Sequence, residues 1–189
     1  MVEMRVAGIA LDAASRSPIV LLRDPSGRRQ VPIWIDQAQA QNILAGLSEE
    51  PPTRPLSHDL MADLIDAGGL QLDRVVIHTI EDSTFRAVLK LSPARDGEGA
   101  APGEETSASS IELDARPSDA IALALRTGSS IWMLEEVVAD ASIPVDAEAD
   151  AQEQDNFRRF LDSTSPADLV RHLKQARPEA DQPGDEPTA

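Results

Sequence analysis

The chain has 189 residues and no cysteine, which excludes disulfide bonds, thiolate metal sites and cysteine nucleophiles. Its formal net charge is −16 at pH 7, and a surface of that sign repels nucleic acid and anionic membranes. Hydrophobic residues make up 41% of the sequence and aromatic residues only 3%, so the expected core consists of Leu, Ile, Val and Ala. No apolar run reaches membrane-spanning length and no secretory leader begins the chain, so we expect a soluble, cytoplasmic protein.

Short apolar runs alternate with turn signals through the first 145 residues. The expected elements, in chain order, are strands at 5–12, 18–23 and 29–35, helices at 36–47 and from 57 to 68, strands at 70–80, 84–91 and 111–114, a helix from 117, a strand at 130–134 and a helix at 135–141. Asp24-Pro25-Ser26-Gly27 predicts a turn, and Glu81-Asp82-Ser83 predicts a hairpin. Hairpin strands with helices inserted between them indicate an α+β fold with a mixed or antiparallel sheet.

The composition changes after residue 145. Residues 1–145 form the expected globular domain, 146–176 an acidic helical extension, and 177–189 a polar tail that we expect to be disordered. A surface loop without regular structure is expected at 93–110, which is rich in Gly, Glu, Ala and Ser. The extension is either an acidic, solvated spacer or a docking segment for a protein partner.

Two expected helices begin with the same kinds of polar residue. One start is the stretch 114–119, DARPSD, which precedes an apolar run to Leu125, and Arg126 is the first residue expected to face water. The other start is 54–59, RPLSHD. Proline suits the first helical turn, and Ser and Asp suit its free N–H groups and its dipole.

Helix capping accounts for Ser, Pro and Asp at these starts but leaves the cationic residues unexplained. A third start, Ser165-Pro166-Ala167-Asp168, has the capping residues and no Arg. Arg54, Arg116 and His58 therefore require an acidic partner or an anionic ligand, because the helix dipole disfavours cations there. A structural Arg–Asp clamp and an anion site both satisfy this requirement.

Five segments share their order and spacing with a known family. They are residues 18–22, 31–35, 54–60, 84–87 and 114–126, of which the last, DARPSDAIALALR, is the most specific. On these segments, which lie within about residues 4–144, the chain resembles the bifunctional nuclease domain family. The resemblance implies a self-associating α+β domain and, from some relatives, nuclease activity on RNA and DNA. Many relatives carry Gly and Glu where this chain has Asp36 and Gln39, and Gln39 cannot replace a Glu that binds metal or moves protons.

Hydrolysis of a phosphodiester requires an activated water and stabilisation of charge at phosphorus and at the leaving oxygen. Under the nuclease interpretation, the catalytic candidates are His58, Asp59, Asp119 and Arg116. The candidates for substrate binding are Arg54, Ser57 and Ser118. The candidates for binding a divalent metal, Mg²⁺ or Mn²⁺, are Asp59, Asp114 and Asp119. No organic cofactor is expected, and binding of nucleic acid by so acidic a protein is expected to be weak and salt-sensitive.

Each candidate also has a structural explanation. His58 can pack at its helix start, Asp114 can pair with Arg116, and the other carboxylates can serve as caps. Trp34 and Trp132 are expected to anchor the core rather than to stack on bases. The alternative function is a non-catalytic oligomeric scaffold or regulatory binding module. The nuclease interpretation requires the two helix starts to meet at an open cleft, whereas the alternative has their charges buried and paired.

Overall fold

The computed structural model describes residues 1–50, 52–94, 110–145, 155 and 159. Its elements, in chain order, are β1 (Val2–Leu11), β2 (Pro18–Arg23), β3 (Arg29–Trp34), α1 (Gln37–Leu47), α2 (Ser57–Ala67), β4 (Leu70–Glu81), β5 (Thr84–Pro93), β6 (Ile111–Ala115), α3 (Pro117–Thr127), β7 (Ser130–Met133), α4 (Glu135–Ala141) and β8 (Ile143–Pro144). The predictions for the acidic extension, the tail and most of the 93–110 loop lie outside the described residues.

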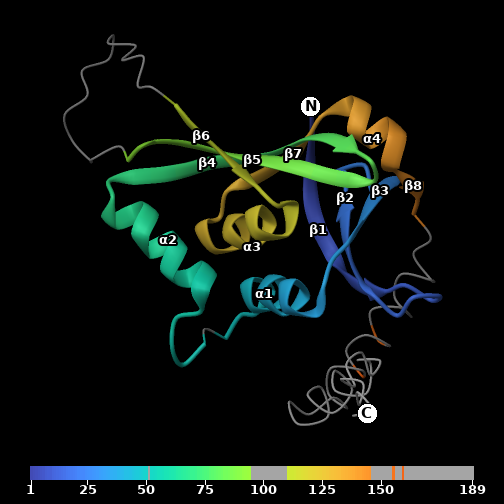
Figure 1. Ribbon diagram of the computed structural model, residues 1–189, viewed down its shortest axis with the longest axis horizontal. Helices are drawn as coiled ribbons and strands as arrows, with labels where there is room; N and C mark the ends of the chain where they lie inside the picture. The colour runs from blue at the N-terminus through green and yellow to red at the C-terminus, as the bar shows by residue number, and fades with distance from the viewer. Residues whose placement is uncertain (51, 95–109, 146–154, 156–158, 160–189) are drawn as a thin grey trace, which may run out of the picture.

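The strands form one mixed sheet in the order β6-β5-β4-β7-β1-β2-β3-β8. β4 and β7 run parallel, and the other neighbouring strands run antiparallel. β7 therefore joins one antiparallel unit, β4 to β6, to a second one, β1 to β3 with β8 (Figure 1). The α+β class and the mixed sheet that the sequence predicts are confirmed.

Local sequence explains how deeply β2 is buried and which backbone conformations the turns adopt. Five of the six residues of β2, which reads PIVLLR, are buried, as expected for a strand covered on both faces. At the predicted turn after β2, Gly27 has a φ of 70° and its N–H donates to the Asp24 carbonyl (3.0 Å). The β4–β5 hairpin closes through Asp82 and Ser83, whose φ values of 47° and 61° are typical of a tight two-residue turn.

Helix α3 lies at the centre of the core. Pro117 occupies its first turn, and Gly128 follows its end with a φ of 69°, which a glycine adopts without strain. Residues Ala120–Ala124 are buried, and α3 contacts α1, α2 and strands β4, β5 and β7. Figure 1 shows α1, α2 and α3 together on one side of β4 and β5, whereas α4 lies at the far end of β7. In the described ranges, no helix has the length and apolarity needed to cross a bilayer.

Three expectations about the fold are wrong or incomplete. Trp34 is exposed rather than in the core, because Ile33 and Ile35 take the inward positions beside it. Arg126 is buried rather than water-facing, because its position two turns after Asp119 turns it towards α2. The short edge strand β8 was not predicted, since two residues carry no periodicity signal.

Candidate functional site

The two polar helix starts, remote in sequence, meet in the structure. His58 Nε2 on α2 lies 3.3 Å from Asp119 Oδ1 on α3, across 61 positions of sequence. Because a carboxylate only accepts, Nε2 is the nitrogen that carries the proton in this contact. The two helix starts therefore converge, and their contact is a buried one, because His58 is only 4% exposed.

At the start of α3, Asp119 is held from two sides. Arg116 Nε donates to its second oxygen, Oδ2, at 2.7 Å, and His58 holds the first. This carboxylate raises the pKa of the Arg116 guanidinium above its ordinary value, through the hydrogen bond first and charge attraction second. The Arg116 side chain is 67% exposed, and only its Nε is engaged within the described residues. Its two terminal nitrogens can therefore reach an anion in solution.

At the start of α2, the polar residues divide between the interior and the surface. His58 is only 4% exposed, and its Nδ1 has no hydrogen-bond partner among the described residues. Asp59 accepts from the Leu56 N–H (2.7 Å), which is the largest cause of its lowered pKa. Arg54 and Ser57 are exposed. His58 is therefore buried behind Asp119, whereas Arg54 and Ser57 lie at the surface.

Asp59 also pairs with Arg126, a residue that the sequence interpretation did not include among the site candidates. Arg126 Nε donates to Asp59 Oδ1, and its Nη1 donates to the carbonyls of Asn42 (3.0 Å) and Ala122 (2.8 Å). Arg126 follows Asp119 by seven positions, so both face α2 from the same side of α3. The seven-residue spacing of Asp119 and Arg126, together with the adjacent His58 and Asp59, could have predicted two charge pairs between α2 and α3.

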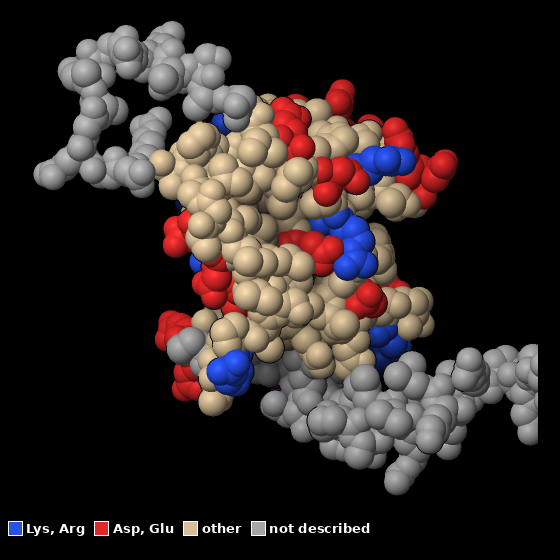
Figure 2. All heavy atoms as spheres, turned by 60° about the vertical axis from the view of Figure 1, so that its left-hand side comes forward, with Lys and Arg blue, Asp and Glu red and all other residues tan. Residues whose placement is uncertain are grey.

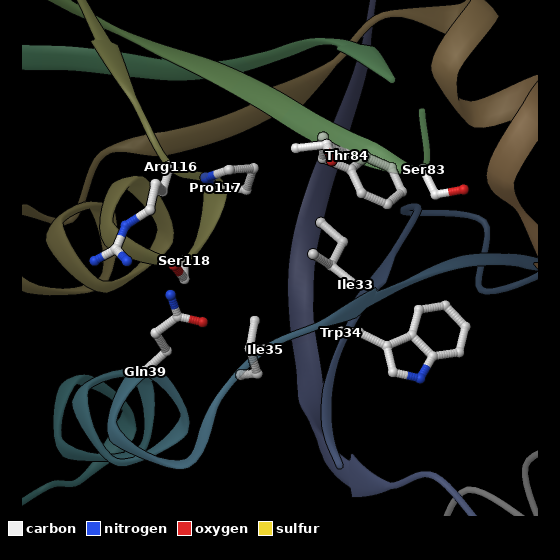
Figure 3. A pocket seen from close by; sticks show the side chains of 10 residues that line it. Ile33, Trp34, Ile35, Gln39, Ser83, Thr84, Arg116, Pro117 and Ser118 are labelled. Carbon is white, nitrogen blue, oxygen red and sulfur yellow. The ribbon is translucent and has the colours of Figure 1, made fainter. Parts of the chain in front are cut away.

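A cavity of about 250 Å³ opens beside Arg116. β3, the start of α1, the β4–β5 hairpin and the start of α3 line it with Ile33, Trp34, Ile35, Gln39, Ser83, Thr84, Phe85, Arg116, Pro117 and Ser118. In Figure 3, Arg116, Ser118 and Gln39 lie at one end and Trp34 at the other, with Ile33 and Ile35 between them. The cavity therefore has a polar end that carries a cation and an aromatic end.

The predicted site residues reach this cavity unequally. Arg116 and Ser118 line it, and Asp119 follows directly on α3. Arg54, Ser57, His58 and Asp59 belong to the α2 start and are not among its lining residues. Gln39, Thr84 and Trp34 were not proposed as site residues, although Thr84 and Trp34 lie in segments that carry the family resemblance and Gln39 lies four residues after one of them.

The predicted metal ligands do not gather. Asp59 is engaged by Arg126, Asp119 is engaged by His58 and Arg116, and Asp114 is exposed on β6. Asp114 is not the partner of Arg116, because Asp119 takes that role. Among the described residues, no group of three or more His, Asp or Glu side chains is placed to hold one metal ion. The residues present do not fit a carboxylate-held Mg²⁺ or Mn²⁺, and metal dependence itself stays a prediction.

Charges on the described surface are mixed. Figure 2 shows acidic atoms spread over one face, with basic atoms in small separate groups and wide uncharged areas between them. A long duplex is usually held along a continuous basic track, and this face offers separate cations instead. That binding of nucleic acid is weak and salt-sensitive stays a prediction.

Comparison with known proteins identifies the family. The model of the bifunctional nuclease domain matches residues 20–146. Two uncharacterized proteins of Mycobacterium tuberculosis, MT1877 of strain CDC 1551 / Oshkosh and Rv1829 of strain ATCC 25618 / H37Rv, are each 37% identical over 177 residues. Each alignment covers 89% of this chain and 98% of the relative. With the predicted fold confirmed and the two helix starts in contact, the chain belongs to the bifunctional nuclease domain family.

Proposed function

We propose that the chain is a low-specificity nuclease that hydrolyses phosphodiester bonds of RNA and DNA at the cavity beside Arg116. One observation carries the proposal: an exposed guanidinium and a doubly held carboxylate, Asp119, stand together at the start of α3 beside an open cavity. The family supports the same activity class. Phosphate oxygens and a developing negative charge need the kind of donors that Arg116 and the helix start present.

The proposed reaction uses groups of this chain. The terminal nitrogens of Arg116 donate to the non-bridging phosphate oxygens, and the Ser118 hydroxyl is a further donor at the same end of the cavity. A water oxygen attacks phosphorus and gives its proton to Asp119, while the bond to the leaving oxygen breaks and that oxygen takes a proton from solvent. His58 is a positioning residue, because its Nε2 fixes the Asp119 carboxylate from the buried side.

The competing proposal is a non-catalytic scaffold or regulatory binding module, which self-associates or docks a partner through 146–176. The ion pairs at the two helix starts favour the scaffold, because Asp59 pairs with the buried Arg126 and Asp119 pairs with Arg116. In that case the helix starts act as clamps and the cavity binds without cleaving. The two proposals differ in one measurable quantity, which is turnover.

The test is cleavage of labelled single-stranded RNA and DNA by the purified full-length chain, with Mg²⁺, with Mn²⁺ and with chelator. Under the proposal, Arg116→Ala lowers the cleavage rate about 100-fold, as loss of a transition-state donor does elsewhere. Arg86→Ala is the matched control, because Arg86 is also an exposed arginine in an ion pair, with Glu81 at 3.0 Å, and lies outside the cavity lining. If the parent chain cleaves no faster than the Asp119→Asn variant in every metal condition, the nuclease proposal is wrong and the scaffold proposal remains.

A further inference from the structure

An exposed tryptophan at the mouth of the cavity is the feature that the proposed chemistry does not use. Trp34 ends β3 and is 56% exposed, although its two neighbours, Ile33 and Ile35, are buried. The chain has only two tryptophans, three phenylalanines and no tyrosine, so a large exposed ring is a rare feature here. An exposed indole that lines a cavity offers a flat apolar face with a polar edge.

The two ends of the cavity suit the two chemical parts of a nucleic-acid strand, its phosphates and its bases. At one end, Arg116 and Ser118 provide donors for phosphate oxygens, and at the other Trp34 provides a surface for a planar ring (Figure 3). The volume of about 250 Å³ lies below the roughly 300–1,000 Å³ of sites for drug-sized ligands. The cavity is therefore too small to enclose a stacked duplex.

Electrostatics favour a single strand over a duplex. The protein carries a net charge of −16, and Arg116 is the one cation among the residues that line the described cavity. Duplex DNA presents about one negative charge per 1.7 Å of axis, and a single strand presents half as many. With so little local positive charge, stacking must supply part of the binding energy, and an aromatic ring supplies it to any base.

We propose that Trp34 is a stacking platform for the base of one unpaired nucleotide, while Arg116, at the other end of the cavity, binds a phosphate of the same strand. The inference rests on the proposed function and names its substrate class, which is single-stranded RNA or DNA. A duplex does not bind this way, because its base faces are covered by neighbouring base pairs and only the base edges are open.

A single-tryptophan variant makes the platform directly visible. Trp132 is half-buried, donates from its Nε1 to Ser130 Oγ (2.8 Å) and lies outside the cavity lining, so Trp132→Phe leaves Trp34 as the only indole emitter. In low salt and chelator, a 15-residue oligothymidylate is expected to quench this emission, and a duplex of the same length is expected to quench it far less. Unchanged emission at saturation, with saturation measured by the anisotropy of a labelled oligonucleotide, overturns the proposal.

Substitutions at Trp34 test the ring itself. Trp34→Leu is expected to weaken single-strand binding about 5- to 150-fold, the range that one base–aromatic stack supplies, and Trp34→Phe to restore part of it. The matched control is Leu64→Ala, which removes an equally exposed apolar side chain from α2 outside the cavity lining and should leave binding unchanged. Circular dichroism shows whether each variant is folded. Equal affinity of the folded Trp34→Leu variant overturns the inference.

Binding and turnover fail separately in this design. If the oligonucleotide quenches Trp34 and binds in a Trp34-dependent way, but is not cleaved in any metal condition, the stacking proposal holds and the nuclease proposal is wrong. Cleavage that is unchanged in Trp34→Leu, with no quenching, removes the platform and leaves the nuclease. If the Trp34 emission changes with protein concentration but not with added oligonucleotide, the ring lies in a contact between two copies of the chain. That result also overturns the inference.

Discussion

Substituting Asn for Asp59 removes the carboxylate that faces the Arg126 guanidinium and keeps the size of the side chain. The side chains of Arg126 and Asp59 are 7% and 24% exposed, so water replaces the lost partner poorly. Removing one partner from a buried ion pair costs about 3–5 kcal/mol, and the partial exposure of Asp59 places the expected loss near about 3 kcal/mol. The carbonyls of Asn42 and Ala122 still accept from Arg126, but neither carries a compensating charge.

The assay is urea unfolding followed by far-UV circular dichroism at pH 7, with a thermal melt as a second readout. A loss of about 3 kcal/mol corresponds to a fall in Tm of roughly 6–12 °C for a domain of this size. Asp63→Asn is the matched control on the same helix, because Asp63 is exposed, and it should stay within about 0.5 kcal/mol of the parent. Arg116→Ala breaks an exposed pair and should cost less than about 1 kcal/mol.

The pH dependence gives the same pair a second signature. The Leu56 N–H and then Arg126 hold the pKa of Asp59 below its ordinary value. Its contribution to stability is therefore complete above pH 4 or so and is lost as the pH falls through the lowered pKa of the folded state. Asp59→Asn should lack this acid-dependent loss. A variant that matches the parent within about 1 kcal/mol at pH 7, with an unchanged urea m value, would refute the idea that Arg126 depends on Asp59.

Three further changes test local contacts. Asp24→Asn removes a carboxylate whose pKa is lowered to about 2 by hydrogen bonds, of which the one from Ser26 is the largest cause. The substitution should cost about 1–2 kcal/mol of stability at pH 7, and it should abolish the loss of stability that the parent shows between about pH 4 and 2. Urea unfolding at each pH measures this, and a parent with flat stability over that range would contradict it. Ser83→Gly relieves a left-handed φ of 61°, so a thermal melt should show about 1 kcal/mol of added stability; an unchanged Tm argues against strain there. Gly46→Ala places a Cβ 2.9 Å from Arg126 Nη1, so a net loss of about 1–2 kcal/mol is expected in urea despite the better helix propensity, and a stabilised variant would show that α1 moves freely away from α3.

The boundaries of most elements could be predicted because local chemistry fixes them. The expected strand at 18–23 coincides with β2, and the helix expected from residue 57 begins there as α2. Their bounds follow from turn residues and from a polar start, which act within a few positions of sequence. Strand order could not be predicted, because the parallel pairing of β4 with β7 joins residues some 55 positions apart in sequence. Hydrophobic periodicity reports only on local structure and does not indicate such pairing.

The site was only half accessible from the sequence. The pairing of Arg, Ser and Asp at two helix starts predicted the convergence that His58 and Asp119 confirm. The sequence does not indicate which charged residues end up buried. His58 and Arg126 look like surface residues by type, and tertiary packing between α2 and α3 encloses both. The exposure of Trp34 was missed for the converse reason, since apolar type predicts burial.

Gln39 has a structural role at the start of α1. Its backbone N–H donates to the Asp36 carboxylate (2.8 Å), and its side-chain oxygen accepts from the Asp36 N–H (2.9 Å), which completes a capping box at the start of α1. Glutamine closes such a box as well as glutamate does, so the position keeps its structural role without a charge. The residues that line the described cavity include no carboxylate, so the proton acceptor that we propose, Asp119, lies next to the lining residue Ser118 on α3 and is not itself a lining residue.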